Sequence, residues 1–263
     1  MAQEGGLALV RKAVEVLDLL AEQGEATAAS IAEDLGEPRS SVYRLLSSLQ
    51  KLQMVESGSG RGAYRLGFHL LSLGTAVVER FDERRFARPV MERLHEQTGE
   101  TVYLCVRRER QAVCIERLDG RRVQSLALKL GGALPLHAGA ASRALLAFDD
   151  RAAWTQYLES GPLQRFTPST PVTGEELLPA LEQVRRDGIA VSDQDVTVGV
   201  AALGVPILDY LGRVRAALSI SGVREAILSD ATTALREQLL LAGEEVSRAM
   251  GWKAVDGAVA DFG

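Results

Sequence analysis

Apolar residues recur at steps of three and four along the first quarter of the chain, a spacing that predicts amphipathic helices. The first helix is expected over residues 9–20, ahead of a glycine. A second short helix is expected over 27–35, with Thr27 as its N-cap. A third is expected over 38–52, since Pro38 is tolerated in a first turn. Three short helices therefore open the chain.

The third expected helix has two chemically distinct faces when residues are placed at about 100° intervals. Its apolar face is expected in the core and comprises Val42, Leu45, Leu46, Leu49 and Leu52. The polar side carries hydroxyls and bases but no carboxylate, so it can enter a DNA major groove without like-charge repulsion. The candidate DNA contacts on this helix are Arg39, Ser40, Ser41, Tyr43, Arg44, Ser47 and Lys51.

A glycine- and serine-rich tip, SGSGRGA, separates two short runs that predict a β-hairpin over residues 54–66. Arg61 lies in this tip and is a further candidate DNA contact. Three helices followed by a basic hairpin is the order of a winged helix-turn-helix. Two alternatives stay open: a small helical bundle with an ordinary hairpin, and a winged helix that binds protein instead of DNA.

The charge distribution favours a nucleic-acid partner although the whole chain has a formal net charge of −5. Residues 38–66 hold five bases and the single acid Glu56, a local charge of +4. A phosphate backbone selects such a basic segment because each neutralised phosphate releases counterions. Acidity elsewhere disfavours indiscriminate binding.

An apolar helix is expected over residues 68–78, followed by the densely charged segment 79–88. We therefore expect a DNA-binding domain over 1–66, a linker over 67–88 and a larger domain over 89–263. The arginines of the charged segment could contact DNA; we favour a solvated face on which they pair with neighbouring acids. These arginines are Arg80, Arg84, Arg85 and Arg88, and the acids are Glu79, Asp82 and Glu83.

The remainder of the chain mixes strands and helices joined by short turns, which predicts an α+β domain with an antiparallel sheet and helices covering one face. Strands are expected over 101–106, 112–118, 123–130, 189–191, 199–208 and 213–220. Helices are expected over 90–99, 139–148, 151–158, 175–187 and 224–250.

Composition limits the function classes. No apolar run approaches the ~20 residues of a membrane span, and no basic segment precedes the first apolar residues as in a signal peptide. We expect a cytoplasmic protein without a membrane partner. Three scattered histidines and the absence of CxxC predict no metal site. Cys105 and Cys114 would lie opposite each other in a hairpin, either as a redox switch or as reduced core residues.

Five stretches in order resemble the IclR (isocitrate lyase regulator) family of bacterial transcription factors, and the resemblance as a whole runs over about residues 7–252. They are SSVYRLLSSLQKLQMVE, YRLGFHLLSLG, ETVYLCVRRERQAVCIERLDG, LPLHAGAASRALLAF and SDQDVTVGVAALGVPILDYLGRVRAALSISGVR. The resemblance implies a GAF/profilin-like sensor domain, homodimers that often pair into tetramers, a double-stranded DNA operator, and control by a small organic acid. It implies no cofactor besides that effector.

The segment LPLHAGAAS precedes an expected helix, where free backbone N–H groups favour an anion. Alternatively, its small residues only allow the helix to pack closely on a sheet. The resemblance places the effector in this region. The candidate contacts are His137, Gly139, Ala140, Ala141, Ser142, Asp193, Asp195, Ala202, Ser219 and Ser221, with Leu128, Leu130 and Leu134 as apolar walls.

Two further interpretations follow from these residues. Alanine at position 202, where the family often has a polar residue, and the leucine walls favour an aromatic or branched acid. A hydrolase triad of His137, Ser142 and Asp193 is an alternative, but Ser142 lacks the GxSxG context and no phosphate-binding loop is present. We therefore expect a transcription regulator and not an enzyme.

Overall fold

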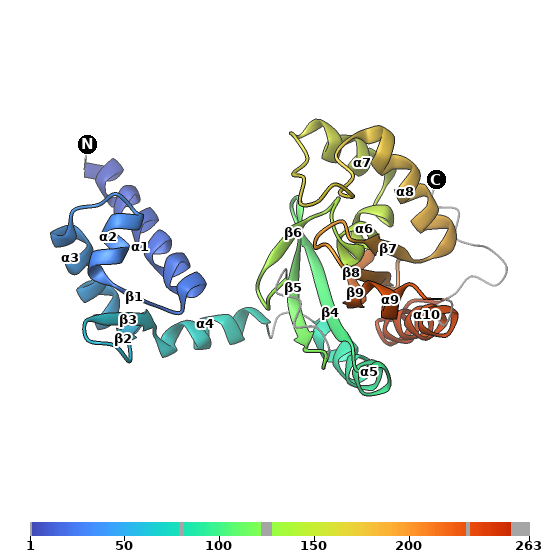
Figure 1. Cartoon of the computed structure of the whole chain (residues 1–263), viewed down its shortest axis with the longest axis horizontal. Helices are drawn as coiled ribbons and strands as arrows, with labels where there is room; N and C mark the ends of the chain where they lie inside the picture. Colours follow the sequence, from blue (N-terminus) through green and yellow to red (C-terminus); the bar gives the residue numbers. More distant parts are fainter. Residues whose placement is uncertain (1, 79–81, 122–127, 230–231, 254–263) are drawn as a thin grey trace. The chain divides into compact units, whose positions relative to one another are not determined.

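The computed structural model describes residues 2–78, 82–121, 128–229 and 232–253. The chain divides into two compact units, residues 1–80 and 81–263, each with its own hydrophobic core (Figure 1). No helix in these described ranges is long and apolar enough to cross a membrane.

The N-terminal unit contains the expected helices and hairpin. Its elements are α1 (Ala2–Gln23), β1 (Glu25–Thr27), α2 (Ala28–Asp34), α3 (Arg39–Lys51), β2 (Val55–Ser57), β3 (Ala63–Leu66) and α4 (Phe68–Val78). Strand β3 lies between β1 and β2 and is antiparallel to both. The winged helix-turn-helix is confirmed. Strand β1 was not expected, because three residues are too few to show an alternating pattern.

Local hydrogen bonds explain where α2 begins. The Thr27 hydroxyl accepts the N–H of Ser30, and the Ser30 hydroxyl accepts the N–H of Thr27. This reciprocal cap satisfies two N–H groups that the first helical turn leaves without partners. Thr27 is therefore the N-cap that the sequence predicts.

The apolar face of α3 packs into the core of the N-terminal unit, with Val42, Leu46 and Leu49 buried. Leu45 is half-buried. Leu52 is 60% exposed, so its expected core position was wrong. It follows Lys51, the last residue of α3, in the turn toward β2, where the helical angles no longer decide which way a side chain faces.

The C-terminal unit is built on a six-stranded sheet in the order β6-β5-β4-β9-β8-β7, with every neighbouring pair antiparallel. The elements are α5 (Asp82–Thr98), β4 (Thr101–Arg108), β5 (Gln111–Leu118), β6 (Ala133–Pro135), α6 (Ala140–Ala147), α7 (Arg151–Glu159), α8 (Gly174–Asp187), β7 (Ala190–Asp193), β8 (Val200–Leu208), β9 (Val214–Val223), α9 (Arg224–Ile227) and α10 (Thr232–Ala249). The expected α+β fold with an antiparallel sheet is confirmed.

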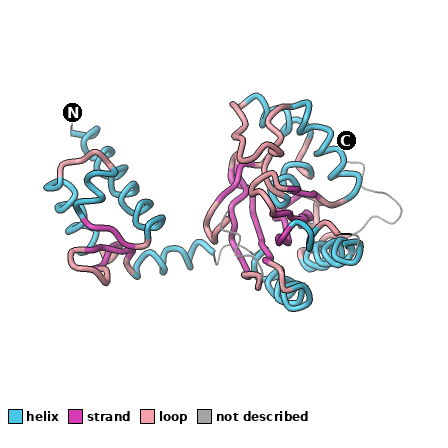
Figure 2. The backbone as a smooth tube through the Cα atoms, in the orientation of Figure 1, coloured by secondary structure: helices cyan, strands magenta, loops and turns pink. Residues whose placement is uncertain are grey.

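Helices cover both faces of this sheet, not one as expected (Figures 1 and 2). Leu218 of β9 packs in one core with Met91 of α5 and residues of α10. Its neighbour Ala217 packs in the other core with Leu145 of α6 and Leu181 of α8. Successive side chains of β9 therefore enter opposite cores, because side chains alternate across a strand.

Three expected elements differ from the structure. Helix α5 continues through Pro89, because burial of Ala87 and Met91 on either side offsets the ~3 kcal/mol cost of a helical proline. The expected helix 224–250 is divided into α9 and α10, since Leu228 leaves helical geometry with φ −119°. Most of the expected strand 123–130 lies outside the described residues, and its described end, 128–130, is not a strand.

Gly204 of β8 allows the start of α6 to approach the sheet. A Cβ built at Gly204 would lie 2.7 Å from the backbone carbon of Ala140. Backbone cannot move aside as a flexible side chain can, so we expect Gly204→Ala to lower the free energy of unfolding by about 1–3 kcal/mol. Chemical denaturation measures this loss. Gly74→Ala is the control, because a methyl at Gly74 meets nothing within 4 Å and should not destabilise.

Candidate DNA-binding face and sensor pocket

The polar face of α3 lies at the surface of the N-terminal unit. Six of the eight candidate DNA contacts are exposed on this helix: Arg39, Ser40, Tyr43, Arg44, Ser47 and Lys51. Ser41 is half-buried, and Arg61 is exposed at the tip between β2 and β3. The structure thus leaves a hydroxyl- and base-bearing helix face open to a partner.

Most bases of this segment carry uncompensated charge. Within the described part of the chain, Arg39, Arg44, Lys51 and Arg61 have no ion-pair partner. Arg65 differs, because its Nε lies 2.8 Å from a carboxylate oxygen of Glu56. Among the described residues, these four cations near α3 and the β2–β3 hairpin are left without an ion pair, a charge pattern that favours phosphate binding.

Glu25 of β1 holds the tip of the hairpin in place. Its carboxylate accepts the backbone N–H of Ser59 at 3.0 Å and the Ser59 hydroxyl at 2.8 Å. These hydrogen bonds, with the nearby charge of Arg65, lower the pKa of Glu25. The pKa of Glu25 is lower in the folded than in the unfolded chain. The stabilisation from its hydrogen bonds with Ser59, here called the tether, is therefore complete above about pH 4 and is lost as pH falls through the lowered pKa.

We expect Glu25→Ala to release this tip. Amide hydrogen exchange at Ser59 should then rise toward the rate of an unstructured peptide, because the acceptor of its N–H is gone. Glu22→Ala is the matched control, since Glu22 is exposed on the same unit and contacts neither Ser59 nor Arg65 in the described structure. Unchanged protection of Ser59 in Glu25→Ala would contradict the assigned tether.

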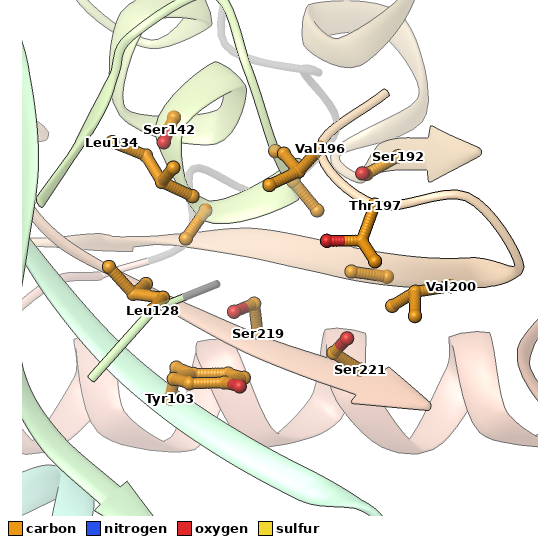
Figure 3. A pocket seen from close by; sticks show the side chains of 14 residues that line it. Tyr103, Leu128, Leu134, Ser142, Ser192, Val196, Thr197, Val200, Ser219 and Ser221 are labelled. Atoms are coloured by element: carbon orange, nitrogen blue, oxygen red, sulfur yellow. The ribbon is translucent and has the colours of Figure 1, made fainter. Parts of the chain in front are cut away.

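A pocket opens between α6 and the sheet of the C-terminal unit, and Figure 3 shows its lining side chains. Nine of the candidate effector residues line it: Leu128, Leu134, Gly139, Ala140, Ala141, Ser142, Ala202, Ser219 and Ser221. Five other residues complete the lining: Tyr103, Ser192, Val196, Thr197 and Val200. The cavity volume is about 60 Å³, enough for several water molecules. The pocket is therefore suited to a small ligand.

The five additional lining residues were missed for different reasons. Tyr103 lies opposite Ser219 in the β4–β9 register, so it points to the same face of the sheet. The period-two pattern of the strands could have identified it once strand pairing was known. Val196 and Thr197 lie in the loop between β7 and β8, where no periodicity indicates direction.

Four candidate effector residues do not line this pocket. Leu130 is 63% exposed in the turn before β6, so it forms no wall. Asp193 forms two hydrogen bonds with Arg224, at 2.6 and 2.8 Å, and these lower the pKa of Asp193. Its carboxylate is therefore committed to a partner outside the pocket.

His137 is directed away from the pocket into a separate cleft beside α7. Its Nδ1 lies 2.8 Å from the Tyr157 hydroxyl, and its Nε2 lies 2.8 Å from the carbonyl oxygen of Gln164. Burial lowers the pKa of His137, so the ring is neutral near pH 7. With both ring nitrogens occupied and Asp193 bound to Arg224, the hydrolase triad is not formed.

Asp195 is buried beside the pocket and organises its edge. Its carboxylate lies 2.8 Å from a guanidinium nitrogen of Arg143 and accepts the N–H of Gly139 at 3.2 Å. It also accepts the hydroxyl of Ser192. Asp195 thus contacts two lining residues, Gly139 and Ser192, and does not itself line the pocket.

The cysteines and the charged segment of α5 have structural partners. Cys105 and Cys114 are opposite each other as predicted, buried and free, and their hydrogen bond with burial raises the pKa of Cys105. Arg84 and Arg88 both contact Glu116 of β5. Glu83 of the same segment pairs with Arg215 of β9. Arg80 and Glu79 lie outside the described residues.

Known proteins resemble the chain over nearly its whole length. The family description "IclR helix-turn-helix domain" matches residues 9–58, and "Bacterial transcriptional regulator IclR C-terminal" matches residues 75–248. The transcriptional repressor AllR of Escherichia coli strain K12 is 34% identical over 256 residues, covering 97% of this chain and 94% of AllR. The transcriptional regulator XynR of the same strain is 33% identical over 246 residues, covering 93% and 98%.

Two crystal structures have closely similar folds. The IclR protein of Thermotoga maritima has a TM-score of 0.80 at 28% identity, covering 94% of this chain and 100% of that protein. An IclR homolog from Microbacterium hydrocarbonoxydans, complexed with 4-hydroxybenzoate, has a TM-score of 0.76 at 27% identity, covering 92% and 99%. Both units of this chain are thus found together in the similar proteins.

Proposed function

The chain belongs to the IclR family of bacterial transcriptional regulators, and from this premise we propose that a small organic acid in the sensor pocket controls its binding to an operator. The chain is a DNA-binding regulator with a winged helix-turn-helix and the C-terminal domain of the family. The observation that carries the DNA-binding part is the exposed α3 face, whose bases have no ion-pair partner among the described residues. We propose repression as its mode, by analogy with AllR.

We propose that two copies bind one operator. Large apolar side chains are exposed on α1 and α4 of the N-terminal unit: Leu9, Val10, Val14, Phe68, Leu71 and Leu73. Exposed apolar surface of this kind is typical of an interface, and a two-fold dimer presents one α3 helix to each half of a pseudo-palindromic site. Pairing of dimers into tetramers remains part of the proposal.

The sensor proposal is supported by the pocket between α6 and the sheet, and by the 4-hydroxybenzoate bound to the Microbacterium homolog. A ligand changes operator affinity only if it binds one arrangement of the protein more tightly than another. Control by the pocket therefore requires that the free and bound forms hold the α3 helices differently in the dimer.

DNase footprinting of DNA that flanks the chain's own gene tests the regulator. We expect two protected half-sites whose centres lie about 10 base pairs apart, or a multiple of that spacing. Absence of protection even at low salt would contradict operator binding. Binding to a protein partner that ignores both salt and Arg44 would instead favour the protein-contact alternative.

A further inference from the structure

We propose that the cleft beside α7, here called the His137 cleft, is a second ligand site, where Arg110 binds the phosphate group of a small phosphorylated molecule and the bound molecule stabilises one wall of the sensor pocket. This site goes beyond the proposed function. The inference follows from the size of the cleft, from an arginine that is held in place without an acidic partner, and from a backbone segment that borders both cavities.

The His137 cleft is large enough for a metabolite. It lies between the turn that joins β4 to β5, the end of β6 and the end of α7. Its volume is about 440 Å³, within the ~300–1,000 Å³ typical of small-molecule sites, whereas the sensor pocket has about 60 Å³. None of its described lining residues lines the sensor pocket. Pro135 and Pro162 give it apolar walls beside its polar groups.

His137 and Tyr157 contribute neutral groups that have no proton left to donate to a ligand. The Tyr157 hydroxyl accepts the backbone N–H of His137 at 3.2 Å, so its own proton is directed to Nδ1 of the ring at 2.8 Å. Nε2 then carries the ring proton and donates it to the carbonyl oxygen of Gln164. Donors for a ligand must therefore come from the other side chains of the lining.

Arg110 is the main donor. Its guanidinium carbon lies 4.6 Å from the centre of the Tyr157 ring, and one of its nitrogens donates to the Tyr157 carbonyl oxygen at 3.0 Å. These contacts fix the half-buried side chain. Within the described part of the chain Arg110 forms no ion pair, whereas its neighbour Arg107 pairs with Asp149. A guanidinium fixed in this way without a counter-ion is suited to an oxyanion, because the rest of its fork remains for the ligand.

The other polar side chains favour a phosphate over a carboxylate. Arg108 adds a second cation, and the amides of Gln111 and Gln164 can each donate N–H groups. A phosphate group has three terminal oxygens that accept from several donors at once, whereas a carboxylate has two. Glu109 is the one acid of the described lining. It is exposed at the turn, so solvent weakens its repulsion of an anion.

One short segment before α6 borders both cavities. Pro135 and His137 line the His137 cleft, and Gly139 lines the sensor pocket. Between them, the N–H of Leu136 donates to the carbonyl oxygen of Arg110 at 3.1 Å, so the proposed phosphate-binding residue is bonded to this segment. A ligand in the cleft therefore stabilises a segment that forms one wall of the sensor pocket. By linkage, a ligand in either cavity then changes the affinity of the other.

Calorimetric titration of the full-length protein in phosphate-free buffer tests the site. The probes are inorganic phosphate, glucose 6-phosphate and acetate. We expect both phosphates to bind in the cleft, and acetate to bind there at least about tenfold more weakly, because it has fewer acceptor oxygens and less charge. Acetate in the sensor pocket is distinguished because its affinity does not change in Arg110→Ala. No phosphate binding, or acetate binding in the cleft as tight as that of phosphate, would overturn the inference.

Three variants locate the phosphate. Arg110→Ala should weaken the binding of both phosphates by about 10- to 150-fold, the effect of losing charge-assisted hydrogen bonds. Glu109→Gln changes an exposed turn residue and should tighten phosphate binding about twofold, because it removes a nearby like charge. Arg186→Ala, at an exposed site on α8, is the control and should not change the affinity. Parent affinity in Arg110→Ala, or no tightening in Glu109→Gln, would contradict the assignment.

Amide hydrogen exchange at Gly139 tests the link between the cavities. The Gly139 N–H is bonded to Asp195 at 3.2 Å, so it exchanges when the segment before α6 opens. Because opening disrupts the phosphate site, phosphate at about ten times its dissociation constant should slow this exchange about tenfold in the parent chain and not in Arg110→Ala. An unchanged exchange rate in the parent chain would contradict the link to the sensor pocket.

Discussion

Asp195→Ala is expected to destabilise the C-terminal unit by about 3–5 kcal/mol, because it leaves the guanidinium of Arg143 buried without its counter-ion. Arg143 and Asp195 are 6% and 1% exposed, so water cannot replace the lost carboxylate. The variant also removes the acceptor of the Gly139 N–H and of the Ser192 hydroxyl. Thermal unfolding should show a drop of about 10 °C, since each kcal/mol is worth about 2–4 °C in a unit of this size.

Asp193→Ala is the matched control for that prediction. Asp193 also pairs with an arginine, Arg224, but both side chains of this pair are 40% exposed. Solvent screens such an exposed pair, so we expect a much smaller loss of stability than from Asp195→Ala. Equal losses of stability from Asp193→Ala and Asp195→Ala would contradict the claim that burial makes the Arg143–Asp195 pair the more important of the two.

Arg44→Ala is expected to weaken operator binding by about 5- to 150-fold, which corresponds to about 1–3 kcal/mol for an arginine that reads a base edge. Arg44 is exposed near the middle of the polar face of α3, and no described acid competes for its guanidinium. Fluorescence anisotropy with the footprinted duplex measures the affinity. The free energy of unfolding of Arg44→Ala should equal that of the parent chain, because the Arg44 side chain is not part of the hydrophobic core.

Arg186→Ala separates loss of a specific contact from loss of one positive charge. Arg186 is exposed on α8 of the other unit and lies far along the sequence from α3. We expect the Arg186→Ala protein to bind the duplex with the same affinity as the parent chain. A similar loss in both variants would mean that Arg44 contributes only general electrostatic attraction.

The buried and exposed faces of α3 could be predicted from sequence because helical periodicity is a local property. Helical periodicity alone separates Val42 and Leu46, which are buried, from Arg44 and Ser47, which are exposed. The prediction was wrong only at Leu52, where the helix has already ended. A helix face is thus recoverable wherever the helix bounds are correct.

The pocket was harder to predict because its lining comes from segments far apart in the chain. Small residues before α6 indicated one wall, and Ser219 and Ser221 indicated another. His137 is only two residues from Gly139 but faces a different cleft, because Gly139 takes φ +87° and the chain turns there. Chemical type indicated what His137 and Asp195 could do, while tertiary packing decided which groups they contact.

Titrating the footprinted duplex with full-length protein over a range of salt concentrations is the most direct test of the regulator. We predict that the logarithm of the association constant falls steeply and linearly with the logarithm of salt concentration, as counterions are released from several phosphates. The slope should flatten by about one unit if a base that touches one phosphate is removed. Binding that does not change with salt, or no binding at any salt concentration, would contradict the account.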